Sequence, residues 1–94
     1  MDALEESERG NKARQLLEHP IYQEAIKNVR DGIIDKWRNA PIRDREGMHE
    51  LKLMDKLLTE VESYIKIVME SGKMADIQLE QERKIVKLRN AGIR

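Results

Sequence analysis

A regular apolar repeat between residues 51 and 68 constrains the fold of this chain more than any other feature. Its members alternate at spacings of three and four residues: Leu51, Met54, Leu58, Val61, Ile65 and Val68. This spacing is the a/d seam of a helix that packs along another helix. A second stripe of Leu57, Tyr64 and Ile67 widens the apolar face beyond a two-stranded coiled coil. The pattern therefore predicts a helix that is covered on more than one side.

The partner of this seam is expected upstream, in a helix over residues 20–38. Its apolar residues recur at helical spacing: Tyr22, Ala25, Ile26, Val29, Ile33, Ile34 and Trp37. Pro20 suits the first turn of a helix, where the missing N–H costs nothing. Residues 39–44 form the connection, in which either Asn39 or Asp44 can cap the next helix. Because short connections join antiparallel helices, we expect a helical hairpin.

Short helical segments are expected before this hairpin, over residues 1–19. Asp2 can cap the first of them, and Gly10 with Asn11 is predicted to interrupt it. A second segment must end before His19, because a residue that precedes proline is pushed out of the α region.

The C-terminal half is predicted to hold two helices. The first covers residues 45–71 and carries the seam. Gly72 can terminate a helix, and the apolar spacing resumes after it, so we expect a break or kink there and a final helix over residues 73–90. Residues 1–94 are thus predicted as one all-α domain, an antiparallel helical hairpin with N-terminal segments and a C-terminal helix. A short chain with so much apolar surface is expected to form an oligomer.

Composition supports helices and argues against several classes of protein. Aromatic residues make up 3% of the chain, and there are 5 Gly and 2 Pro, too few for a sandwich or barrel. The absence of cysteine excludes disulfides and thiolate metal sites. The 18 basic and 18 acidic residues balance, so overall charge favours no polyanionic partner. The acidic start and the lack of a long apolar run predict that the protein has no signal peptide and no membrane span.

Residues that carry catalysis are scarce. His19 and His49 are the only histidines, and neither lies beside a serine in a nucleophile motif. The isolated glycines form no phosphate-binding loop. Glu46 and His49 make one Glu-x-x-His pair, whereas a di-iron site in a helical bundle needs two. We therefore predict a nonenzymatic protein with no metal or other cofactor.

Two groups of residues are candidate contact sites for a protein partner: Trp37, Arg38, Arg43 and Arg45 at the inter-helix turn, with Met69 and Met74 farther along. A tryptophan among arginines has the composition of a binding hot spot, although Trp37 can instead close the hairpin core. The two methionines flank Gly72 and suit either a core or an adaptable interface.

The C-terminal basic residues are candidates for contacts with nucleic-acid phosphates: Arg83, Lys84, Lys87 and Arg89. They can instead be a solvated helix end that the helix dipole favours, or they can attract the acidic head of a neighbouring subunit. Without interleaved aromatic residues, base stacking is not expected.

Three patterns stand between Ala13 and Glu82: Leu16-Leu17-Glu18-His19-Pro20, Trp37 followed by Pro41-Ile42-Arg43-Asp44-Arg45-Glu46, and Ser71-Gly72-Lys73-Met74-Ala75. In them the chain resembles small all-helical proteins of tailed bacteriophages, many of which have no assigned role. The resemblance implies a viral protein of the virion or host cytoplasm and transfers no functional residue.

The expected function is therefore a helical interaction protein of a bacteriophage. It would act through self-association or by binding a larger phage or host protein, as a virion-assembly component or adaptor. One alternative is a nucleic-acid-binding accessory protein that uses the basic tail. The other is an inhibitor of a host enzyme or defence complex. No membrane partner is expected.

Overall fold

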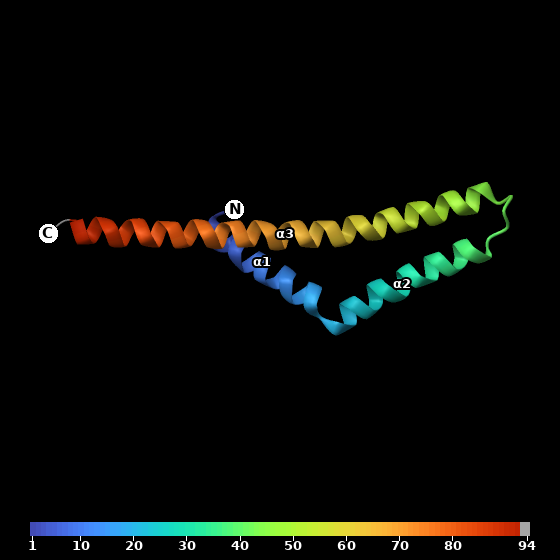
Figure 1. Cartoon of the computed structure of the whole chain (residues 1–94), viewed down its shortest axis with the longest axis horizontal. Coiled ribbons are helices and arrows are strands. Elements are labelled where there is room, and N and C mark those ends of the chain that lie inside the picture. The colour runs from blue at the N-terminus through green and yellow to red at the C-terminus, as the bar shows by residue number, and fades with distance from the viewer. Residues whose placement is uncertain (93–94) are drawn as a thin grey trace. The chain divides into compact units, whose positions relative to one another are not determined.

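The structure is a computed structural model that describes residues 1–92. Three helices and no strand occur in this range: α1 (Ala3–Glu18), α2 (Pro20–Asn39) and α3 (Arg45–Gly92) (Figure 1). The predicted all-α class and the helical hairpin are confirmed. Contacts divide the chain into two units. The hairpin unit is Leu16–Ile65, and the crossing unit combines Met1–Gln15 with the described residues that follow Ile65.

Helix α2 lies close to where the sequence predicts it, and α3 begins at the predicted residue. His19 caps α2, because its Nδ1 accepts a hydrogen bond from the backbone N–H of Ile21 at 3.1 Å. Of the two candidate caps for α3, Asp44 is the one used. Its Oδ1 accepts a hydrogen bond from the backbone N–H of Gly47 at 2.9 Å.

Only part of the apolar seam is covered within the hairpin unit. One row of α3, at intervals of seven residues, is half-buried: Leu51, Leu58 and Ile65. The half-buried positions of α2 include Tyr22, Ile26, Arg30 and Ile33. In this unit, the other row of the seam stays exposed, with Met54 at 48% and Val61 at 53%. The second stripe is also uncovered, since Leu57 is 61% exposed.

The predicted interruption at Gly10 and Asn11 is wrong, because α1 is a single helix from Ala3 to Glu18. Asp2 does cap it, and its Oδ1 accepts a hydrogen bond from the N–H of Glu5 at 2.8 Å. Gly10 stays helical because it serves a tertiary contact. A Cβ at Gly10 would lie 2.6 Å from the Cα of Gly72, so only glycine allows the two backbones to approach this closely.

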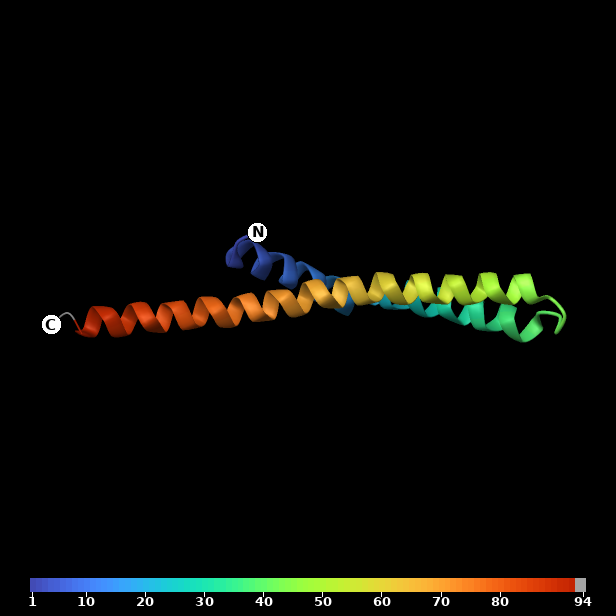
Figure 2. The ribbon, with the colours of Figure 1, turned by 90° about the horizontal axis from the view of Figure 1, so that it is seen from above.

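The predicted break at Gly72, with a separate helix over residues 73–90, is also wrong. Helix α3 continues through Gly72 to Gly92 as one unbroken ribbon (Figure 2). Gly72 is buried against Gly10, and the neighbouring small residues Ala13 and Ala75 are only 8% and 3% exposed. We call these four residues the glycine crossing. At this crossing, Gly72 lets α3 pack closely against Gly10 of α1.

Candidate binding site on the helical hairpin

An open groove in the hairpin unit surrounds Trp37. It has a volume of about 640 Å³ and is lined by side chains of both helices. The apolar lining residues are Ile33, Ile34, Trp37, Met48 and Leu51, and the polar ones are Arg30, Arg45, His49, Lys52 and Asp55. This Trp37 groove is wide enough and apolar enough to accept side chains of another helix.

The charge around the Trp37 groove is mainly basic. Arg45 and Lys52 are seven residues apart on α3 and therefore share one side of the helix. The one carboxylate that lines the groove is Asp55, and it pairs with Arg30. An apolar surface with such a rim favours a ligand that combines apolar side chains with carboxylates.

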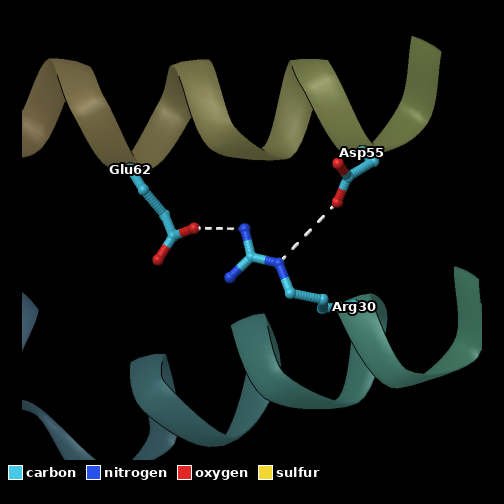
Figure 3. A network of polar contacts seen from close by, with 3 residues as sticks. All are labelled: Arg30, Asp55 and Glu62. Carbon is cyan, nitrogen blue, oxygen red and sulfur yellow. Dashed lines mark hydrogen bonds and ion pairs between the residues drawn. The ribbon is translucent and has the colours of Figure 1, made fainter. Parts of the chain in front are cut away.

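Arg30 joins the two hairpin helices through a network of charged groups (Figure 3). One terminal guanidinium nitrogen donates to Oε1 of Glu62 at 2.5 Å, and Nε lies 3.8 Å from Oδ1 of Asp55. The side chain of Glu62 is only 19% exposed, while that of Asp55 is 52% exposed. The hydrogen bond that Arg30 donates to Glu62 raises the pKa of Arg30 above its ordinary value. Arg30 thus holds α2 on α3 at the edge of the groove.

Tyr22 lies near the carboxylate of Glu62, and its hydroxyl makes no hydrogen bond. Within the described chain, its buried Oη has no hydrogen-bond partner. Burial raises the pKa of Tyr22 above its ordinary value of 10.0, and the negative charge of Glu62 raises it further. A buried donor without a partner destabilises the fold by the free energy of its lost hydration.

We expect Tyr22→Phe to raise the free energy of unfolding at neutral pH by about 1 kcal/mol, because it removes this hydroxyl and keeps the ring. Folding raises the pKa of Tyr22, so at alkaline pH the unfolded parent loses the Tyr22 proton more readily than the folded parent does. The stability of the parent is therefore unaffected by this titration below the unfolded pKa, and it falls as pH rises through the folded pKa. The advantage of the variant should therefore grow above about pH 10. Urea unfolding followed by circular dichroism at neutral and alkaline pH measures both effects. A variant less stable than the parent at either pH would contradict them.

The structure brings together two of the predicted protein-binding residues. Trp37, which is 58% exposed, and Arg45 both line the groove. Arg38 and Arg43 are exposed but are not among its lining residues. Met69 and Met74 belong to the crossing unit, where Met69 is half-buried and Met74 is 72% exposed.

The predicted nucleic-acid contacts lie on the last part of α3. Every residue from Glu80 to Gly92 is exposed, including Arg83, Lys84, Lys87 and Arg89. These four side chains are therefore accessible to solvent, and a role in nucleic-acid binding stays a prediction.

The sequence interpretation missed the ion-pair network, which consists of Arg30 and Asp55 in the groove lining and Glu62 outside it. Arg30 interrupts the apolar stripe of its helix, four residues after Ile26 and three before Ile33. Asp55 and Glu62 are seven residues apart and therefore lie one above the other on α3. A basic residue within the apolar stripe of α2 and two carboxylates at heptad spacing on α3 fit an inter-helix ion pair, but the register that pairs them is not specified by either helix alone.

No cluster of three or more His, Cys, Asp or Glu side chains that could bind a metal ion occurs in residues 1–92. Among the described helices, none has both the length and the apolar character needed to cross a membrane. No family model matches the sequence, and no curated protein or solved structure gives a significant match.

Proposed function

We propose that this chain is a nonenzymatic helical interaction protein that works by associating with itself or with a larger protein. The observation that supports this function is the lack of a buried core. Ala13 and Ala75 are the only buried hydrophobic residues in the described part of the chain, whereas all three helices carry large exposed ones. Burial of such side chains against a partner would supply the missing apolar contacts.

The total accessible surface area of the chain supports the same proposal. The chain exposes 8021 Å², while a compact protein of 11.0 kDa exposes roughly 5600 Å². The excess, on the order of 2400 Å² for one chain, is larger than the roughly 800 Å² that each partner of a standard complex buries.

The resemblance to bacteriophage proteins suggests the setting, a virion-assembly component or an adaptor. The partner would then be a second copy or a larger phage or host protein. For a larger partner, the Trp37 groove suits an amphipathic helix with an acidic flank, since such a helix complements both the apolar floor and the basic rim.

We expect the mass of the protein in solution to exceed that of one chain at high micromolar concentration and to fall on dilution. Size-exclusion chromatography with light scattering measures this mass. Fluorescence of Trp37, the single tryptophan, reports on the groove at the same time. If the protein associates and the emission maximum of Trp37 does not shift to the blue, the Trp37 groove stays free for a larger partner. If the emission maximum does shift to the blue, the Trp37 groove is part of the self-contact. A mass of one chain at every concentration would contradict self-association.

A further inference from the structure

A second groove in the hairpin unit differs from the Trp37 groove in its charge. It has a volume of about 530 Å³ and lies between Val29, Gly32 and Lys36 of α2 and Met54, Leu57 and Val61 of α3. It shares only Ile33 with the Trp37 groove. Lys36 is the one charged residue in its lining. We call it the Gly32 groove.

Several apolar side chains that line the Gly32 groove are more than half exposed. Val29, Leu57 and Val61 are 52%, 61% and 53% exposed. On α3 the row continues to Tyr64, which is 63% exposed, at alternating spacings of three and four. This is the spacing with which one helix inserts its side chains between those of another.

The floor of this groove is open at Gly32. A Cβ at this position would meet no atom within 4 Å, in contrast to the tightly packed Gly10 and Gly72. Glycine is a weaker helix former than alanine, and at this position it serves no close contact inside the chain. It leaves room for a helix from outside to approach α2 closely.

We propose that the Gly32 groove binds the same face of a second copy of this chain, so that two hairpins pack as a four-helix assembly. The inference rests on the self-association proposed above and assigns a surface to it. A twofold contact places each face against itself. With Lys36 as its only charged residue, the Gly32 groove can meet its own copy with little repulsion. The Trp37 groove suits a twofold contact less well, because it would bring Arg45 and Lys52 of one chain near those of the copy.

The amount of exposed surface also fits a second copy. Each chain exposes roughly 2400 Å² more than a compact protein of its mass. A dimer of standard size removes about 800 Å² from each partner. The self-contact therefore leaves surface, including the Trp37 groove, for a further partner.

The test fills the groove at its open floor. In Gly32→Trp the indole projects into the space that the second copy would occupy, and the single chain has no atom there to clash with its Cβ. The matched control is Glu24→Trp, which adds the same side chain at an exposed position of α2 outside the groove lining. Val61→Lys is a second variant that places a charge on the opposite wall. Analytical ultracentrifugation measures the dissociation constant of each variant, and circular dichroism checks its helicity.

We expect Gly32→Trp and Val61→Lys to weaken the dimer by about 100-fold or more, and Glu24→Trp to leave it within about threefold of the parent. Parent protein that is a single chain at all concentrations would reject self-association as a whole. Parent protein that associates while helical Gly32→Trp and Val61→Lys keep its dissociation constant would reject only the Gly32 groove as the contact.

Discussion

Gly72→Ala is expected to lower the free energy of unfolding by about 2 kcal/mol, even though alanine is the better helix former. The added Cβ would lie 2.6 Å from the Cα of Gly10 and 3.1 Å from the backbone oxygen of Glu6. Both neighbours are backbone atoms and cannot turn aside as a side chain does. The helices must separate, and Ala13 and Ala75 then lose the packing that buries them.

Gly32→Ala is the matched control for this prediction. It makes the same substitution inside a helix, but nothing lies within 4 Å of the new Cβ. We expect it to raise the free energy of unfolding by up to about 1 kcal/mol, so the two variants should differ in sign. Urea unfolding at low protein concentration measures both values, and hydrogen exchange should place the loss caused by Gly72→Ala in α1. A change of the same sign in both variants would contradict the close contact at the crossing.

Gly10→Ala should resemble Gly72→Ala, because each Cβ would meet the other glycine at the same distance, 2.6 Å. The double substitution should cost less than the two single ones added together, since the first already separates the helices. Additive losses would instead indicate two independent sites of strain.

The glycine crossing shows why the sequence predicted the helices of the hairpin better than those at its ends. An isolated glycine indicates a helix end when only its neighbours in sequence are considered. The atoms that explain Gly72 belong to Gly10, far away along the chain. One local signal did exist: each glycine is followed three residues later by an alanine, Ala13 or Ala75, so both helices carry a matching stripe of small residues.

The candidate site was predictable to the extent that it depends on local sequence. Trp37 and Arg45 could be grouped because the short inter-helix turn brings them together whatever the packing of the hairpin. The pairing of Arg30 with Glu62 depends on the register of α2 against α3, which no local pattern specifies. The same holds for the Gly32 groove, where residues of two helices form one surface.

The second large loss of stability is expected when Arg30, the cation that links α2 to α3, is replaced. We expect Arg30→Met to lower the free energy of unfolding by about 2 kcal/mol, because it leaves the carboxylate of Glu62, only 19% exposed, without its hydrogen bond. Asp55→Asn should change stability by less than about 0.5 kcal/mol, since this more exposed carboxylate lies 3.8 Å from Nε of Arg30. Urea unfolding of the two variants under one salt condition gives the comparison.

The double variant Arg30→Met with Glu62→Met distinguishes two effects on stability: the ion pair itself, and the cost of leaving the carboxylate of Glu62 without a partner. Replacement of both partners by apolar side chains of similar length removes the unpaired carboxylate, so stability should return to within about 1 kcal/mol of the parent. A double-mutant cycle then gives a coupling between Arg30 and Glu62 of about 1 to 2 kcal/mol, which should shrink at high salt because the pair is only partly shielded from solvent. Strictly additive effects of the two substitutions would show that the hairpin does not depend on this ion pair, and that its half-buried apolar rows alone hold α2 on α3.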